Sequence, residues 1–371
     1  MKHNAAKPKF AAILQLEGVH EEVIPSVVNA LALNGYRSKI FMNEVILQNR
    51  EDIFAHLPQF DAEYHYVPIK TVQDWKTLEN TVKGDPEIDL VFFNTFQRKG
   101  GANLAKHIDK PTIGIVHNPS FFNQAHPWVK DMDMSKVSLL TLASHATSEM
   151  IKVNPAKYAN TGTISPYYWG FPTDIMRLGD FEKRRRLIIP GSVNFANRDY
   201  SVVFSAVKNM VKTGLMPIGV ICIIGGGPHR EKFEKSIIEE GLSDWFDFAP
   251  LNAKTGYVTH EDYFKELQRA NFILPILPLA KTDYRTYKIS ASISTAAGYS
   301  IPPILDRWTA MAYAIPGIIY DQGDLTSGLK RAMTLTPREY VQLRSEVQDY
   351  RTNALKKNGG EINRLINKMS N

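Results

Sequence analysis

Hydrophobic positions in this chain follow two patterns, one typical of strands and one typical of helices, which alternate along the sequence. Short apolar runs, the first at residues 10–16, are followed by longer stretches in which apolar residues recur every third or fourth position. One helical face of the first such stretch carries Val23, Ile24, Val27, Val28 and Leu31. Asn34-Gly35 then ends this helix. Strand-like runs that alternate with amphipathic helices predict a parallel sheet with crossover helices.

The same alternation continues as far as residue 168. Further strands are predicted at residues 38–42, 64–67, 90–93, 112–116 and 139–142. Segments of helical length lie between most of these strands, as crossover connections require. We therefore predict one doubly wound α/β domain over residues 1–168.

A linker is predicted over residues 169–186, where the alternation stops. Gly170, Pro172 and Gly179 interrupt any regular pattern, and a basic run follows at residues 183–186. We interpret the basic run as a solvated part of the linker. Contact with an anionic partner or with membrane headgroups is the alternative.

A second alternating series begins at residue 187. Strands are predicted at residues 187–190, 219–224, 246–249, 272–276, 303–305 and 318–320, and helices at residues 200–212, 230–241, 260–270 and 287–297. This series predicts a second doubly wound domain over residues 187–336. The charged tail over residues 337–371 is predicted to be helical, broken at Gly359-Gly360, and to pack back toward the first domain.

Composition narrows the class of protein. Hydrophobic residues make up 44% of the 371 positions and charged residues 22%, which is typical of a globular chain. The apolar runs are strand-sized, too short for a membrane span or a signal peptide. The single cysteine, Cys222, lies in the apolar run 220–224, so we expect a buried, inert thiol and a cytoplasmic protein.

The net charge of +6 is compatible with nucleic acid, an anionic membrane surface or a phosphate-bearing substrate as partner. Most basic residues are dispersed along the chain rather than gathered in a stripe. This pattern argues against nucleic-acid binding. A peripheral contact with the inner face of the membrane stays open as an alternative.

The turn Gly225-Gly226-Gly227-Pro228 is the most informative local motif. It lies between a predicted strand and a predicted helix, where backbone N–H groups can hold an anion in parallel sheets. Glycines allow the backbone to approach a diphosphate closely. A plain tight turn is the alternative for three glycines taken alone.

Residues 223–252 resemble a recurring stretch of the GT-B glycosyltransferases, in particular the retaining, family-4-like (group 1) enzymes. The shared pattern is a strand, a Gly-x-Gly-Pro turn, a helix and a second strand, although Phe248-Ala249-Pro250 stands where the family usually has a glycine. Pro190-Gly191-Ser192 and residues 288–302 extend the similarity. The resemblance implies two Rossmann-like domains facing each other across a cleft, with the nucleotide-sugar donor on the C-terminal domain and the acceptor on the N-terminal domain.

One departure from the family pattern affects the chemistry. Many retaining members carry two glutamates eight positions apart, where this chain has Arg285 and Ile293. The polar residues nearby are Ser290, Ser292 and Ser294, and a hydroxyl cannot supply the charge-assisted bond of a carboxylate. The stereochemical outcome therefore stays open, and so does a catalytically inactive relative.

The resemblance implies a set of donor-binding residues. They are Gly18, Ser192, Arg198, Gly225, Gly226, Gly227, Pro250, Tyr284, Tyr287, Lys288, Ser290 and Ser292. Arg198 and Lys288 lie at predicted helix starts and are the candidate cations for the diphosphate. The alternatives are surface cations for these two, an ordinary turn glycine for Gly18, and edge tyrosines for Tyr284 and Tyr287.

Three residues are candidates for catalysis. His117 follows the strand at residues 112–116 and should emerge at the carboxyl edge of the sheet, unless it is a structural histidine bonded to backbone. His20 and Glu21 follow the first strand, where they face the cleft as acceptor contacts or a base, or simply cap a helix.

No metal is expected in the predicted reaction. Asp131 and Asp133 form an Asp-x-Asp pair, which is the metal-binding signature of a different glycosyltransferase architecture, and such a pair is frequent by chance. We expect a metal-independent, hexosyltransferase-type enzyme that moves a sugar from a nucleotide-diphosphate donor to a hydroxyl of a glycan, a lipid-linked saccharide or a protein. A non-hydrolysing nucleotide-sugar epimerase and an inactive, glycosyltransferase-like binding subunit are the alternatives.

Overall fold

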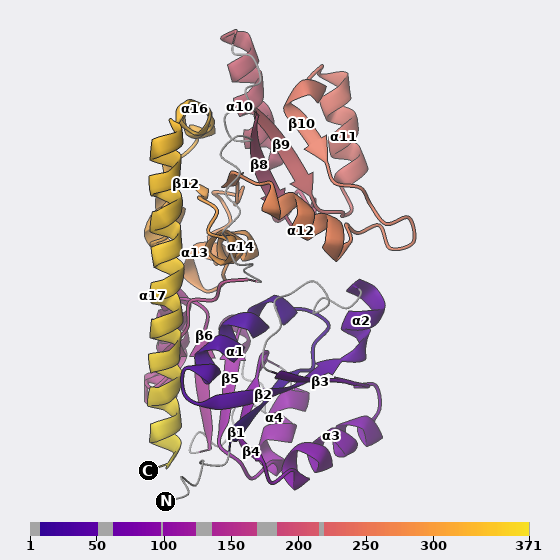
Figure 1. Cartoon of the computed structure of the whole chain (residues 1–371), viewed down its shortest axis with the longest axis vertical. Coiled ribbons are helices and arrows are strands. Elements are labelled where there is room, and N and C mark those ends of the chain that lie inside the picture. The colour runs from indigo at the N-terminus through magenta and orange to yellow at the C-terminus, as the bar shows by residue number, and fades with distance from the viewer. Residues whose placement is uncertain are drawn as a thin grey trace, which may run out of the picture.

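The computed structural model of the chain describes residues 8–50, 62–97, 99–123, 136–168, 184–214 and 219–370. Two α/β units lie one above the other along the long axis (Figure 1). We call them the N-terminal unit, up to residue 168, and the C-terminal unit, from residue 184 to residue 336. Helix α17 (Pro337–Ser370) runs beside both units.

The N-terminal unit is built on seven parallel strands in the order β3-β2-β1-β4-β5-β6-β7. They are β1 (Lys9–Gln15), β2 (Tyr36–Asn43), β3 (Ala62–Val67), β4 (Ile88–Phe93), β5 (Thr112–Val116), β6 (Val137–Thr141) and β7 (Gly162–Thr163). The helices of this unit are α1 (Ile24–Ala32), α2 (Glu44–Arg50), α3 (Val72–Gly84), α4 (Lys99–His107), α5 (Ser120–Asn123), α7 (Ser144–Val153) and α8 (Pro155–Tyr158). The strand order reverses at β1 and β4, which is where such sheets form a ligand crevice.

The C-terminal unit contains a sheet in the order β10-β9-β8-β11 and a pair β12-β13, joined by a bridge between Ile273 and Pro303. The strands are β8 (Arg185–Pro190), β9 (Gly219–Ile224), β10 (Phe246–Phe248), β11 (Phe272–Ile273), β12 (Ile304–Asp306) and β13 (Ile318–Tyr320). The helices are α10 (Tyr200–Lys212), α11 (Arg230–Glu239), α12 (His260–Gln268), α13 (Asp283–Thr286), α14 (Ala291–Tyr299), α15 (Arg307–Tyr313) and α16 (Leu325–Thr334). The prediction of two α/β units with parallel sheets is confirmed.

The interpretation of the basic run at residues 183–186 as a solvated part of the linker is wrong for its last two residues. Strand β8 begins at Arg185, so the last two residues predicted as linker belong to the sheet. Arg186 is mostly buried, and its guanidinium pairs with Glu266 Oε2 at 2.5 Å and with Asp247 Oδ2 at 2.8 Å. Arg186 therefore serves the packing of the C-terminal unit and is not a solvated linker cation.

Two predicted helices have different bounds in the structure. The helix predicted at residues 287–297 begins only at Ala291, because the backbone at Ser290 is extended and its N–H donates to the Tyr313 hydroxyl at 2.8 Å. The predicted break at Gly359-Gly360 is wrong, since α17 continues through it. Gly359 lies against Leu33, where a Cβ atom at residue 359 would be 2.9 Å from Cδ1, so this glycine allows close packing of α17 on α1.

Helix α17 joins the two units through buried contacts. It packs on α1 and β7 of the N-terminal unit and on α14 of the C-terminal unit. The Asn358 side chain donates to the Ser165 carbonyl at 3.0 Å and accepts from the Ser165 N–H at 2.9 Å. One hydrophobic cluster includes Ile13, Ile293 and Leu365, so the units share a core.

Two further expectations concern single features. Cys222 is buried in β9, as predicted, and burial raises the pKa of its thiol to about 12, which disfavours the reactive thiolate. Within the described ranges, no helix combines the length and the apolar composition needed to cross a bilayer.

Candidate functional site

The two units enclose a cavity of about 570 Å³, which we call the inter-unit cavity. It lies beyond the carboxyl ends of β8 and β9, where parallel sheets usually bind ligands. The N-terminal unit contributes Glu21, Glu22, Gln48 and Tyr168. The C-terminal unit contributes Gly191, Ser192, Ile224, Gly225, Gly226, Asn252, Lys254, Thr255, Tyr257, Val258, Thr259, His260, Tyr263, Ala291 and Thr295.

The glycine turn, Gly225–Gly227, forms part of the cavity wall with bare backbone. A Cβ atom at Gly225 would overlap the Gly191 carbonyl, and one at Gly226 would overlap the Gly256 carbonyl. Gly227 lies behind this wall at a φ of +135°, a conformation that favours glycine. Close packing therefore requires a tight turn of glycines here, and the same turn exposes backbone to the cavity. The interpretation as a plain tight turn and the interpretation as an anion-binding turn are thus compatible.

Arg198 lies against this wall. Its Nη2 is 2.5 Å from the position that a Cβ atom on Gly191 would take. Among the described residues, the Arg198 side chain has no ion pair, although its charge acts on Tyr200 and Tyr263. A half-buried guanidinium beside a glycine-lined wall is suited to binding an anion.

Lys288 and its neighbours lie away from the inter-unit cavity. The Lys288 ammonium pairs with Asp283 Oδ2 at 3.1 Å, and its backbone carbonyl accepts from His145 Nε2 at 2.9 Å. The Tyr284 carbonyl accepts from the Tyr313 hydroxyl at 2.6 Å. None of the following predicted donor-binding residues lines the cavity: Lys288, Tyr284, Tyr287, Ser290, Ser292, Pro250, Gly18, Arg198 and Gly227. The candidate catalytic residues His20 and His117 do not line it either.

Burial explains two of these positions. Ser290, just before α14, is 2% exposed, and Ser292, within α14, is 1% exposed. They pack inside the C-terminal unit, while α14 reaches the cavity through Ala291 and Thr295. The structure therefore does not bring the glycine turn and the predicted residues within 284–292 together in one site.

His117 is buried at the end of β5, as predicted. Its Nε2–H donates to the Asn94 carbonyl at 2.7 Å, which leaves Nδ1 as the acceptor nitrogen of a neutral ring. Burial, and then the neighbouring charge of His20, lowers the pKa of His117 to about 3. The ring stacks on that of His20, with centroids 4.1 Å apart. His117 is therefore bonded to backbone and also placed at the sheet edge.

His20 occupies an unusual backbone conformation in front of the short helix η1 (Glu21–Val23). Its φ is 80°, and its carbonyl accepts from Asn94 Nδ2 at 2.8 Å. Its side chain makes no capping hydrogen bond, so the capping interpretation is wrong for this residue. A non-glycine residue in the left-handed region is uncommon and is frequently associated with function.

Two carboxylates follow His20. Glu21 is 1% exposed and Glu22 is mostly buried, and both line the inter-unit cavity. Glu22 Oε1 lies 3.8 Å from His20 Nδ1. The structure therefore brings His117, His20 and Glu21 together, and it adds Glu22, which sequence reasoning missed although it is the next residue.

Lys254 is the second missed residue. It belongs to the loop at residues 252–258, which follows β10 and folds over the glycine turn, where Gly256 meets Gly226. A search of the turns after strands could have found it, because this loop is such a turn. No other lysine or arginine lines the inter-unit cavity among the described residues.

The positions of the missing glutamates have structural roles. The buried Arg285 pairs with Asp306 Oδ2 at 3.2 Å and donates to Thr309 Oγ1 at 2.9 Å. Ile293 is 3% exposed and faces a second cavity of about 50 Å³, the junction cavity. The two positions thus belong to packing and not to the inter-unit cavity.

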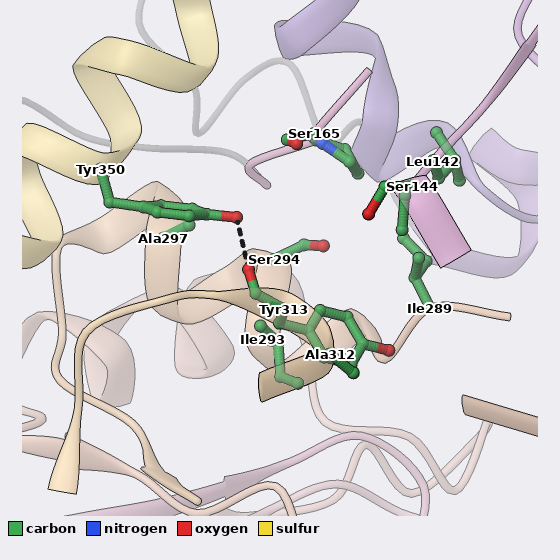
Figure 2. A pocket seen from close by; sticks show the side chains of 12 residues that line it. Leu142, Ser144, Ser165, Ile289, Ile293, Ser294, Ala297, Ala312, Tyr313 and Tyr350 are labelled. Carbon is green, nitrogen blue, oxygen red and sulfur yellow. Dashed lines mark hydrogen bonds between the residues drawn. The ribbon is translucent and has the colours of Figure 1, made fainter. Parts of the chain in front are cut away.

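Figure 2 shows the junction cavity, where the two units and α17 meet. Ser144 and Ser165 come from the N-terminal unit, Ser294 from α14, and Tyr350 from α17, whose hydroxyl donates to the Tyr313 carbonyl at 3.4 Å. Since one water needs about 10–15 Å³ of such space, the cavity has room for a few waters but not for a nucleotide.

No group of three or more histidine, cysteine, aspartate or glutamate side chains that could hold a metal ion occurs in the part of the chain that the structure describes. Asp131 and Asp133 lie outside the described residues.

Comparison with solved structures identifies the fold. HepE of Anabaena, in a crystal structure with UDP and glucose, superposes with a TM-score of 0.63 at 10% identity, over 97% of this chain and 99% of that one. A glycosyltransferase of Rickettsia africae superposes with a TM-score of 0.62 at 10% identity, over 96% and 99%. WaaG, a glycosyltransferase of lipopolysaccharide biosynthesis, reaches 0.54 at 13% identity, over 92% and 95%.

No protein-family model matches the sequence, and neither does any curated protein. At these identities the likeness concerns architecture, and it extends over nearly the whole chain in each case. The protein consists of two α/β units, each built on parallel strands, with a ligand-sized cavity between them. It therefore has the GT-B fold of glycosyltransferases.

Proposed function

We propose that this protein is a glycosyltransferase, which moves a sugar from a nucleotide-diphosphate donor to an acceptor hydroxyl. The observation that carries the proposal is the inter-unit cavity, which combines a bare glycine wall on one unit with the carboxylates Glu21 and Glu22 on the other. His20, the residue before Glu21, stacks on His117. The fold is shared with HepE, which has been crystallised with UDP-glucose. A hexose as the transferred group is part of the proposal.

The diphosphate binds at the C-terminal side of the cavity. Gly225, Gly226 and Lys254 line this side, and the Arg198 guanidinium lies against Gly191, another lining residue. These groups stabilise the charge that develops on the leaving diphosphate, and they act without reorganisation because they are already in place. We therefore propose a metal-independent reaction.

The transferred sugar and the acceptor meet at the N-terminal side. His117 offers the lone pair of Nδ1 to a hydroxyl of the sugar or of the acceptor, since its Nε2–H is committed to Asn94. His20 is the candidate base, because its imidazole Nδ1 lies 3.8 Å from Glu22 Oε1, which holds the ring beside the carboxylate. The acceptor is a hydroxyl of a glycan, a lipid-linked saccharide or a protein.

Arg198→Ala tests the phosphate site. We expect it to lower the affinity for UDP or GDP roughly 10- to 100-fold, because a hydrogen bond to a charged group contributes about 1.5–3 kcal/mol. Titration calorimetry measures the affinity, and release of labelled nucleotide from a sugar-nucleotide donor measures transfer. Arg307→Ala is the matched control, since Arg307 is exposed on α15 and pairs with Asp321 outside the cavity.

Unchanged affinity and transfer in Arg198→Ala would remove the proposed role of this residue. Conversion of the sugar nucleotide without an acceptor would instead identify an epimerase. Binding of the nucleotide without any turnover would identify a binding subunit.

A further inference from the structure

We propose that Glu22 selects the donor sugar, binding hydroxyls of a neutral hexose and excluding donors whose sugar is a hexuronic acid. The inference rests on the proposed function, because it assigns the sugar end of the same cavity. It concerns the N-terminal unit, whereas the family resemblance places sugar-binding glutamates on the C-terminal unit, at positions where this chain has Arg285 and Ile293.

The inter-unit cavity has a cationic end and an anionic end. Lys254 lines it beside the glycine turn of the C-terminal unit, and Arg198 lies against the same wall. The acidic residues that line it, Glu21 and Glu22, both come from the N-terminal unit. A diphosphate is attracted to the first end and repelled by the second, so a bound donor points its sugar toward the carboxylates.

Glu22 is the carboxylate placed to meet that sugar. Its side chain is 19% exposed, whereas Glu21 is 1% exposed overall and lies deeper. The charge of Glu22 acts on tyrosines of both units. Burial, and then Glu22, raises the pKa of Tyr168. Burial raises the pKa of Tyr263 to about 12; Thr295 and Arg198 oppose this rise and Glu22 adds to it. Tyr168 and Tyr263 come from the two units and both line the cavity.

The opposite wall offers no carboxylate. Helix α14 reaches the cavity through Ala291 and Thr295, and its sequence contains no acidic residue. A charge-assisted bond to a sugar hydroxyl must therefore come from the N-terminal unit among the described lining residues. Glu22 can accept two such bonds from neighbouring hydroxyls, one on each oxygen.

The same carboxylate disfavours an acidic sugar. A hexuronic acid carries a carboxylate of its own, which on this side would face Glu21 and Glu22, whereas Lys254, the one lysine among the described lining residues, belongs to the opposite unit. Like charges in a partly enclosed site repel more strongly than in water. Neutral and acidic donors that share a nucleotide should therefore bind with clearly different affinities.

Binding measurements on the full chain test the inference without an acceptor. The probes are UDP, UDP-glucose and UDP-glucuronate, with GDP, GDP-mannose and GDP-mannuronate as the second set. For the set that binds, we expect the wild type to bind the neutral sugar nucleotide at least tenfold more tightly than the acidic one. Glu22→Gln should retain or improve the affinity for the bare nucleotide, weaken that for the neutral sugar nucleotide, and reduce the difference to less than threefold.

Two further variants complete the design. Glu22→Asp keeps the charge, so it should continue to exclude the acidic sugar even where the shorter side chain weakens binding of the neutral one. Glu79→Gln is the matched control, because Glu79 lies on α3, pairs with His107 and does not line the cavity. The wild-type comparison needs no variant, so misfolding of a variant does not leave the inference untested.

The outcomes separate the two proposals. If neither bare nucleotide binds the wild type, the proposed function itself fails. If a nucleotide binds but the wild type takes the acidic sugar nucleotide as tightly as the neutral one, only the assignment of Glu22 is overturned. The same conclusion follows if Glu22→Gln discriminates as strongly as the wild type.

Discussion

His117 combines a structural role with an open ring nitrogen. Its Nε2–H satisfies the Asn94 carbonyl, its ring stacks on His20, and its Nδ1 stays available as an acceptor. Burial costs a charged imidazolium far more than a neutral ring, which is why the pKa falls to about 3. A neutral ring of this kind can accept a hydrogen bond throughout the physiological pH range, without changing its charge.

His117 should make the protein sensitive to acid. Its pKa is about 3 in the folded chain and about 6.5 when unfolded, so the unfolded state binds the extra proton between these values. Its stabilising contribution is complete above pH 6.5 and is lost as the pH falls, at up to about 1.4 kcal/mol per pH unit. Two neighbouring groups act on the pKa of His117, His20 lowering it and Glu22 raising it.

The measurement is urea denaturation between pH 7 and pH 5, for the wild type and for His117→Gln. Glutamine can still donate to the Asn94 carbonyl but takes up no proton, so the variant should lose less stability over this range. Subtracting the two curves removes the carboxylates that both proteins share. Parallel curves would contradict a neutral, buried His117.

At the scale of elements, the glycine turn between β9 and α11 packs closely against two other segments, the loop at residues 252–258 and the turn after β8. Residues 252–258 fold back so that Gly256 meets Gly226, and Gly191 meets Gly225. No side chain fits at either contact, and the resulting wall is backbone. The loop that carries Lys254 is thereby seated against the proposed phosphate position.

Gly226→Ala should disturb both the wall and the loop. The new methyl group would overlap the Gly256 carbonyl, so the loop has to move. We expect a loss of about 1–3 kcal/mol in the free energy of unfolding, as for other overpacked sites, and at least tenfold weaker nucleotide binding. Urea denaturation and calorimetry measure these two effects.

Gly84→Ala is the control, because a Cβ atom at this position on α3 meets nothing within 4 Å. It should leave nucleotide binding unchanged. Wild-type affinity in Gly226→Ala would show that the loop does not depend on this contact.

At the scale of the whole molecule, α17 sets how the units are joined. It contacts α1 and β7 on one unit and α14 on the other, and the shared hydrophobic cluster runs along it (Figure 1). The two units should consequently unfold together. The cavity between them depends on this arrangement, since its two ends belong to different units.

Adjacent glycines in α17 offer a matched test. Gly360 is exposed with nothing within 4 Å of an added Cβ atom, so Gly360→Ala should stabilise the protein by about 1 kcal/mol through helix propensity. Gly359 is buried against Leu33, so the same gain in Gly359→Ala should be cancelled or reversed by the displaced leucine. Urea denaturation followed by circular dichroism and by tryptophan fluorescence measures both.

We expect coincident transitions for the two probes in every variant. Equal stabilisation by both alanines would contradict close packing of α17 on α1. Separate transitions would show that the two units unfold independently.

Much of the architecture was determined locally. The strands at residues 112–116, 219–224 and 318–320 and the helix at residues 200–212 have the predicted bounds. Strands buried on both faces need continuous apolar runs, and helices need an apolar stripe, so these signals are contained in short windows. For the same reason the glycine turn and the position of His117 at a strand end were predictable.

The membership of the site was decided only by the tertiary structure. Lys288 pairs with Asp283, and the Ser290 N–H donates to the Tyr313 hydroxyl. Neither residue lines the cavity. Glu22 and Lys254 come together there from elements more than two hundred positions apart. Local periodicity determines which residues form a strand, a helix or a turn, whereas the direction of a polar side chain depends on partners that only the folded chain brings near.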